Sequence, residues 1–174
     1  MTTPFVCESD DYLGLTPLHD AIIEMDIETI KKLLEQDDIE DYVNETDAEG
    51  DTPLHYAVIR ENFEIVKLLV QCGADVNAEN NICKTPLHEA VKSGTYEMVD
   101  FLIENCADVN VMDDPNNTPL HYARDEIMCE ILLKAGADVS IENEFGYTPI
   151  TELAMIRDKN ENHIAKILKM VLYL

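Results

Sequence analysis

Hydrophobic residues recur along this chain in pairs of short helical patterns separated by polar residues. A first pattern begins after Pro53 and places Leu54 and Ala57 three residues apart, on one face of a helix. A second pattern follows with an apolar stripe of helical period at Ile65, Val66, Leu68 and Leu69. The small side chain of Ala57 permits a neighbouring helix to approach closely. The pattern therefore predicts a short helix followed by a second, antiparallel helix.

This pair of patterns repeats along the whole chain. The tetrapeptide Thr-Pro-Leu-His begins at Thr16, Thr52, Thr85 and Thr118, and a degenerate fifth copy runs from Thr148 to Thr151. The start-to-start spacings are 36, 33, 33 and 30 residues. A near-constant period of this length indicates a stacked repeat array. Such an array has no single pocket by construction, so its function is expected on an extended surface.

Polar and glycine residues punctuate each unit. Asp47 to Gly50 predicts a turn in which glycine supplies a positive φ. Thr52 is a natural N-cap, and Pro53 suits the first helical position, where a missing N–H costs nothing. Gly73 is expected to end the second helix in the left-handed conformation.

A turn, a short helix, a second antiparallel helix and a loop, repeated about every 33 residues, resemble the ankyrin repeat. The four Thr-Pro-Leu-His motifs lie in phase with Gly-Ala-Asp-Val at Gly73 and Gly136 and with Cys-Ala-Asp-Val at Cys106. The resemblance covers residues 11–174 and implies an all-α ankyrin-repeat solenoid with β-turn fingers, forming a single domain over 1–174. The expected repeats are 11–46, 47–79, 80–112, 113–142 and 143–174.

Several units depart from the pattern. The first unit carries a loop three residues longer, over 37–44, and the fourth unit is three residues short near Arg124. In the third unit, Cys83 and Cys106 occupy the turn and cap positions of glycine. A residue other than glycine at positive φ costs on the order of 1 kcal/mol. The third unit is therefore expected to be the most strained locally.

The fifth unit inserts about six residues within 157–163, ahead of an apolar helix that reaches the C-terminus. Met170, Val171, Leu172 and Leu174 lack the polar outer face that terminal repeats usually present. Two explanations remain open: the last helix caps the array itself, or the chain is cut from a longer array.

Charge narrows the range of partners. Acidic residues number 36 against 12 basic ones, a net charge of −24, while 46% of residues are hydrophobic, which supports a folded core. This charge disfavours nucleic acid and anionic membranes, and it favours either a basic protein partner or simple solubility. Nine acids and no Lys or Arg lie between residues 35 and 51. That run is either a solvated edge or a docking patch for a basic peptide.

No catalytic or cofactor chemistry is expected. The motif histidines His19, His55, His88 and His121 repeat at about the 10 Å helix-packing distance, which is too wide to share a zinc ion. We expect them to bond turn backbone between repeats. Of the five cysteines, only Cys83, beside Lys84, is a candidate for reactivity. No phosphate loop or hydrolase motif occurs, so we predict no enzyme activity, no metal and no cofactor.

The N-terminal sequence and the cysteines also indicate where the protein is located. The N-terminus lacks a basic segment followed by an apolar one, so no secretory signal is visible. The odd number of cysteines without CxxC spacing fits reduced thiols. A cytoplasmic, alternatively nuclear, monomer is therefore expected.

The ankyrin resemblance implies binding through the turn fingers and the first-helix face. Carried onto this sequence, the family's variable positions give a set of candidate partner-binding residues: Glu49, Asp51, Tyr56, Ile59, Arg60, Ile82, Lys84, Glu89, Lys92, Asp114, Asn117, Tyr122, Asp125, Phe145 and Tyr147. Aromatic residues beside charge are typical of interface hot spots. Tyr56, Tyr122, Phe145 and Tyr147 are otherwise unexplained exposed rings, so we interpret them as contacts.

The resemblance also bears on Asn77 and Asn110. Both lie in Leu-x5-Asp-Val-Asn contexts similar to sites of asparaginyl hydroxylation. The alternative is a loop asparagine that hydrogen-bonds its own turn.

These observations favour a non-enzymatic module that binds a basic or mixed-charge protein and acts by occupancy. Two alternatives stay open. The chain is an architectural fragment of a larger protein, or it resembles the short viral IκB-like ankyrin proteins, which mask basic segments of Rel-type transcription factors.

Overall fold

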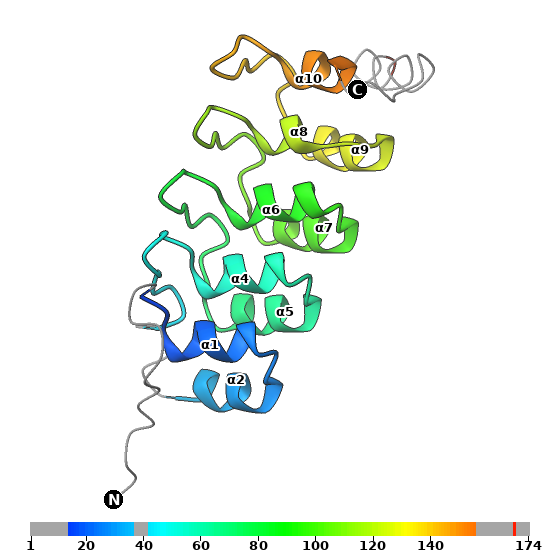
Figure 1. Cartoon of the computed structure of the whole chain (residues 1–174). Helices are drawn as coiled ribbons and strands as arrows, with labels where there is room; N and C mark the ends of the chain where they lie inside the picture. Colours follow the sequence, from blue (N-terminus) through cyan, green and yellow to red (C-terminus); the bar gives the residue numbers. More distant parts are fainter. Residues whose placement is uncertain (1–13, 37–41, 156–168, 170–174) are drawn as a thin grey trace, which may run out of the picture.

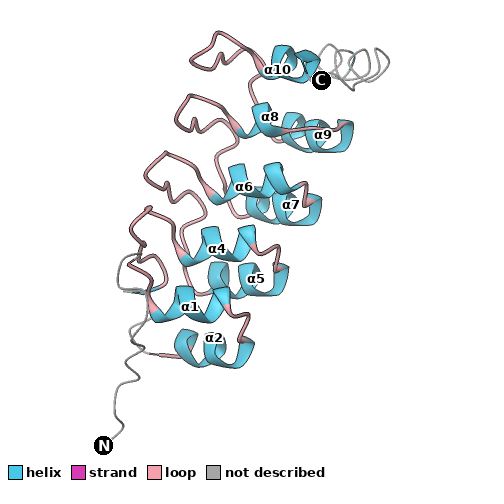
Figure 2. Cartoon of the chain, viewed as in Figure 1, coloured by secondary structure: helices cyan, strands magenta, loops and turns pink. Residues whose placement is uncertain are grey.

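The computed structural model describes residues 14–36, 42–155 and 169, and within them the fold is all-α. Helices follow one another in pairs that stack into a column, with the long loops between pairs projecting from one side (Figures 1 and 2). The helices of the described residues are α1 (Pro17–Ile23), α2 (Ile27–Leu34), α4 (Pro53–Ile59), α5 (Phe63–Gln71), α6 (Pro86–Ser93), α7 (Tyr96–Glu104), α8 (Pro119–Tyr122), α9 (Glu126–Lys134) and α10 (Pro149–Met155). The prediction of an all-α solenoid is confirmed.

The first helix of each unit begins where the sequence predicts. Thr16, Thr52, Thr85 and Thr118 are N-caps in extended backbone, and a proline follows each of them. The second helices begin at polar caps that the sequence pattern did not single out: the side chains of Asp26, Asn62 and Asp125 accept backbone N–H groups of the first turn.

The core lies between two layers of helices. The first-layer helices α1, α4, α6, α8 and α10 pack on one another in order, and the partner helix of each pair covers one side of this layer. Leu54, Leu87, Ile65 and Leu69 are fully buried. Leu68, predicted to be buried with them, is only half-buried, because it lies at the edge of the buried stripe of α5.

Positive φ angles mark where the local sequence conflicts with the fold. Cys83 (φ 56°) and Cys106 (φ 68°) adopt the left-handed conformation, as their glycine positions predict. Sequence reasoning missed Met25 (φ 60°) and Glu61 (φ 54°), which occupy the turn between paired helices. Gly94 fills that position in the third unit (φ 79°) and supplies the one signal that could have revealed it.

Replacing both strained cysteines by glycine is expected to stabilise the protein. In Cys83→Gly/Cys106→Gly, relief of left-handed strain gains about 1 kcal/mol per site, partly offset by the greater backbone entropy of the unfolded chain. We expect a net rise of about 1 kcal/mol in the free energy of unfolding, measured by urea denaturation. Cys72 (φ −90°) is the matched control. Cys72→Gly is expected to lower stability, and a fall in both variants would contradict strain at Cys83 and Cys106.

The predicted deletion in the fourth unit falls on its first helix. Helix α8 has only four residues, and Asp125 caps α9 three residues after α8 ends. The predicted insertion at 157–163, the final apolar helix and residues 37–41 of the lengthened loop lie outside the described residues. The alternatives for the end of the array are therefore untested.

Candidate partner-binding surface

Each finger is a turn held by one side chain. Asp47 Oδ1 accepts the backbone N–H groups of Glu49 and Asp51, both at 2.9 Å. Asn80 and Asn143 do the same in the third and fifth units. Gly50 sits in the turn at φ 80°, which confirms the predicted glycine turn. The side chain at the start of each turn therefore sets the finger's shape.

Consecutive fingers are joined through their backbones. Asn81 N–H donates to the carbonyl of Glu49 (2.9 Å), Asp114 N–H to that of Ile82 (2.9 Å), and Glu144 N–H to that of Pro115 (3.1 Å). The same bond occurs at the same position of three successive fingers, which lie along one edge of the column (Figure 2). The fingers thus form one continuous row.

The four motif histidines connect neighbouring units, as predicted. His55 Nδ1 accepts the N–H of Thr52 (3.1 Å), so this nitrogen carries no proton and Nε2 does. Nε2–H then donates to the carbonyl of Lys84 in the next unit (3.0 Å). His19, His88 and His121 make the equivalent bonds to Asp51, Asn117 and Tyr147. Each histidine fixes the finger of the following unit.

A second set of connectors lies in the loops after the second helices. The Asn77 amide donates to the Cys106 carbonyl (3.0 Å) and accepts the N–H of Asp108 (2.8 Å). Asn44 and Asn110 bridge to the loop of the next unit in the same way. For Asn77 and Asn110, the alternative that the side chain bonds its own turn was wrong, because the amide reaches both a donor and an acceptor of the next loop.

Tyr56 and Tyr122 are not unexplained exposed rings, which corrects the sequence interpretation. Both are half-buried, and their hydroxyls donate to Asp47 (2.8 Å) and Asp113 (2.5 Å). Burial, with the neighbouring carboxylate, raises the pKa of both phenols. Each ring also packs edge-on against the histidine of the preceding unit.

The sequence carries a signal for this tyrosine contact. In the second and fourth units the finger begins with aspartate, and the residue nine positions later is a tyrosine that donates to it. Where the finger begins with asparagine, Glu89 or Glu152 occupies that position, and Glu152 accepts weakly from Asn143 (3.4 Å).

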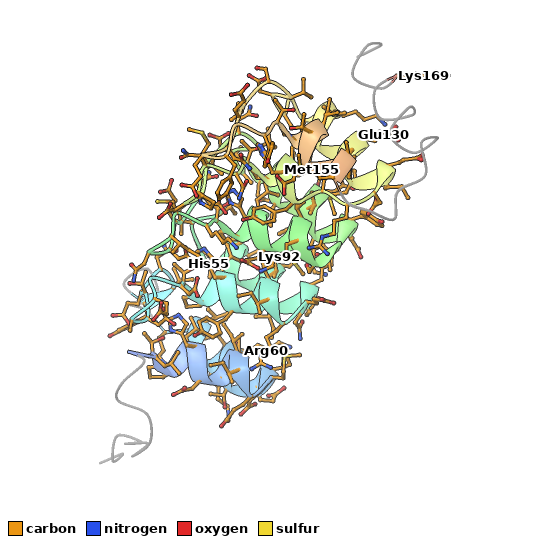
Figure 3. All side chains as sticks on the ribbon, turned by 45° about the horizontal axis from the view of Figure 1, so that its top comes forward. His55, Arg60, Lys92, Glu130, Met155 and Lys169 are labelled. Carbon is orange, nitrogen blue, oxygen red and sulfur yellow. The ribbon has the colours of Figure 1, made fainter. Side chains whose placement is uncertain are left out.

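The middle of the first-helix face is charged but paired. Glu89 lies 3.3 Å from both Lys84 and Lys92, and Lys84 Nζ lies 5.0 Å from the centre of the Tyr122 ring. Arg60, Lys92 and Met155 follow one another along the array (Figure 3). The middle of this face thus consists of a lysine pair that shares one carboxylate, and Arg60 is exposed at the C-terminal end of α4.

Three further candidates have structural contacts. Asp51 accepts the Asn80 amide (2.8 Å), Asn117 accepts the Asn143 amide (2.9 Å), and Asp125 caps α9. A partner can contact these residues only alongside the bonds they already make.

Exposed candidates gather at the fingertips and at the end of α4. The Glu49, Asp114 and Glu144 side chains are exposed and pair with no basic group of the described residues. Ile82, Phe145 and Tyr147 expose 47%, 64% and 36% of their surface, and Ile59 exposes 50%. Of the fifteen predicted residues, five therefore lie exposed on the row of fingers: Glu49, Ile82, Asp114, Phe145 and Tyr147.

The described residues offer little for other chemistry. No group of three His, Cys, Asp or Glu side chains there is arranged around a metal, and no helix among them is long and apolar enough to cross a membrane. Every buried polar side-chain atom in this part of the chain has a hydrogen-bond partner. Cys83 and Cys106 are exposed, whereas Cys129 is buried.

Comparison with known proteins gives the same architecture. The family model described as Ankyrin repeats (3 copies) matches residues 4–80 and 79–143. No curated protein matches the chain. The matched ranges cover most of the chain, and the stacked helix pairs, hydrogen-bonded fingers and histidine connectors agree with the match. The chain belongs to the ankyrin repeat family.

Proposed function

We propose that this chain binds a basic or mixed-charge protein through its fingers and first-helix face, and that it acts by occupying that partner rather than by catalysis. Ankyrin repeats are in general protein–protein interaction modules and typically non-catalytic. The observation that carries the proposal is the row of exposed acids at Glu49, Asp114 and Glu144. The backbone of each of these three residues is bonded to a neighbouring finger, so little order has to be gained when a partner binds.

Charge gives the partner's class. The chain carries a net charge of −24, and such a field attracts cationic surfaces and speeds their encounter. Ion pairs between the described residues lie on helices α5, α6 and α9, or join Lys84 to α6. The fingertip carboxylates are therefore available to Lys or Arg of a partner.

A narrower form of the proposal is an IκB-like inhibitor that masks the basic segment of a Rel-type transcription factor in the cytoplasm or nucleus. Its support is the acidity of the chain and the ankyrin fold. The remaining candidate is an architectural role within a larger protein, for which fingertip charge would be irrelevant.

Affinity capture from a cell lysate tests the proposal with two variants. Each variant removes three negative charges, from the fingers in one case and from helix α7 in the other. One variant carries Glu49→Gln, Asp114→Asn and Glu144→Gln on the fingers. Its matched control carries Glu97→Gln, Asp100→Asn and Glu104→Gln on exposed positions of α7. We expect the finger variant to lose about tenfold in recovery of its partners, because each exposed pair contributes up to about 1 kcal/mol.

The α7 variant is expected to capture the same proteins as the wild type. Raising the salt concentration should reproduce the loss, since screening weakens exposed charge pairs. Equal losses in both variants would show that only net charge matters, and no loss in either would remove the acidic fingers from the proposal.

A further inference from the structure

From the third unit onward, the third position of each fingertip turn is occupied by an apolar residue. The third position of the turn is Glu49 in the second unit, then Ile82, Pro115 and Phe145 in the units that follow. Ile82 and Phe145 are among the most exposed large apolar side chains of the described residues, and Pro115 is half-buried. Tyr147 lies in the same finger as Phe145. We name Ile82, Pro115, Phe145 and Tyr147 the fingertip strip.

The strip is held in a line. The carbonyls of Ile82 and Pro115 each accept a backbone N–H from the next finger. Ile82 and Phe145 also donate their own N–H groups to the first side chain of their turn. Residues at the same position of turns built alike leave the backbone in the same direction. The strip thus presents apolar groups at the period of the array, about 10 Å, the packing distance of the helices.

Acids flank the strip in the fourth and fifth units. The residues directly before Ile82, Pro115 and Phe145 are Asn81, Asp114 and Glu144. Of these, Asp114 and Glu144 are exposed acids. An occupant therefore has to supply apolar groups about 10 Å apart and positive charge between them.

An extended segment in the polyproline II conformation meets this requirement. It has three residues per turn and rises about 3.1 Å per residue, so every third side chain lies on one face, about 9 Å from the next. A β-strand would send positions i and i+3 to opposite faces, and a helix would advance only about 4.5 Å over the same interval.

We propose that the fingertip strip binds an extended segment with apolar residues at i, i+3 and i+6 and with Lys or Arg between them. This rests on the proposed function and specifies the partner's binding segment. The aliphatic and aromatic contacts set the register of the segment on the fingers, and Asp114 and Glu144 receive its positive charges. The segment fits because it is ordered at low entropic cost before it binds.

Fluorescence anisotropy with two labelled nine-residue peptides tests the strip in the full chain. The probe is three copies of Lys-Pro-Leu. The register control has the same composition with leucine at every second position, Leu-Lys-Leu-Pro-Leu-Lys-Pro-Lys-Pro. We expect the probe to bind about tenfold more tightly than the control, roughly the effect of burying part of one large apolar side chain.

Alanine variants test whether the preference for the probe over the control peptide depends on the fingertip strip. Phe145→Ala and Ile82→Ala should reduce it to about twofold or less, whereas Ile127→Ala, at an apolar site on α9 whose exposure lies between those of Ile82 and Phe145, should keep it. Equal binding of both peptides by the wild type would overturn the strip while leaving charge recognition by the fingers intact. Binding of neither peptide, or an unchanged preference in Phe145→Ala and Ile82→Ala, would also overturn it. The capture experiment judges the proposed function separately.

Discussion

Mild acid is expected to unfold this array at a pH where its carboxylates are still charged. The reason is the set of four buried histidines at His19, His55, His88 and His121, which expose 7% of their surface or less. Each Nδ1 accepts a backbone N–H, so a proton added to Nδ1 would meet the hydrogen of that donor and replace the hydrogen bond by repulsion. Protonation therefore breaks the cap of the first helix in that unit.

The direction of the effect follows from the pKa values. Burial lowers the pKa of all four histidines below the ordinary 6.5 and outweighs the carboxylates and carbonyls that act in the opposite direction. The charged groups that face the imidazoles are Asp20, Asp47 and Asp51 for His19; Asp47, Asp51 and Glu89 for His55; Asp113, Glu89 and Lys84 for His88; and Asp113 and Glu152 for His121.

A lowered folded-state pKa means that the histidine contribution to stability is complete above pH 6.5 and is lost as the pH falls below it. Each histidine contributes up to about 1.4 kcal/mol per pH unit to the slope of the free energy of unfolding against pH. Four histidines therefore contribute at most about 5.5 kcal/mol per pH unit. Urea denaturation at pH 7.5, 6.5 and 5.5 and constant ionic strength measures this slope. His121→Gln, at the most exposed of the four, should reduce it by about a quarter. A free energy of unfolding that is constant or rises between pH 6.5 and 5.5 would contradict the role of these histidines.

Gly50→Ala is expected to destabilise the protein by about 2–4 kcal/mol, because two penalties combine. Gly50 has φ 80°, which costs a residue with a Cβ about 1 kcal/mol or more. Its Cβ would also lie 2.7 Å from both the N and the Oδ1 of Asn81 in the next finger. Relieving that overlap requires backbone movement, and overpacking of this kind costs about 1–3 kcal/mol.

A comparison with Gly146 separates the penalty for the left-handed backbone from the penalty for steric overlap. It occupies the same turn position at φ 75°, but an added Cβ would meet nothing within 4 Å. Gly146→Ala should therefore cost only the conformational part, about 1 kcal/mol. Thermal or urea denaturation of both variants makes the comparison. Equal losses of stability would mean that the contact between the second and third fingers does not constrain Gly50.

The sequence predicted the frame of this fold because the frame depends on local chemistry. Thr52 and Pro53 start a helix, and Gly50 or Cys83 turns a finger, from interactions within a few residues. The positive φ of Cys83 and Cys106 was predictable because neighbouring units have glycine there. The bonds of Asn77 could not be inferred in this way, since both of its partners lie about 30 residues further along the chain.

The candidate surface was predicted less well than the frame. Position within the repeat placed Glu49, Ile82 and Phe145 on the exposed row, but it could not show that the hydroxyls of Tyr56 and Tyr122 are bound to aspartates. For these two tyrosines the bond is made to the turn residue nine positions earlier. Comparing the units with one another, position by position, would have revealed that pairing.

Hydrogen–deuterium exchange of the chain with and without its most strongly captured partner shows whether the fingers and first helices bind that partner. We expect slower exchange in the fingers at 47–51, 80–84, 113–117 and 143–147 and in α4 and α6, with exchange in α5, α7 and α9 unchanged. Protection confined to the outer helices α5, α7 and α9, with the fingers unchanged, would contradict this expectation.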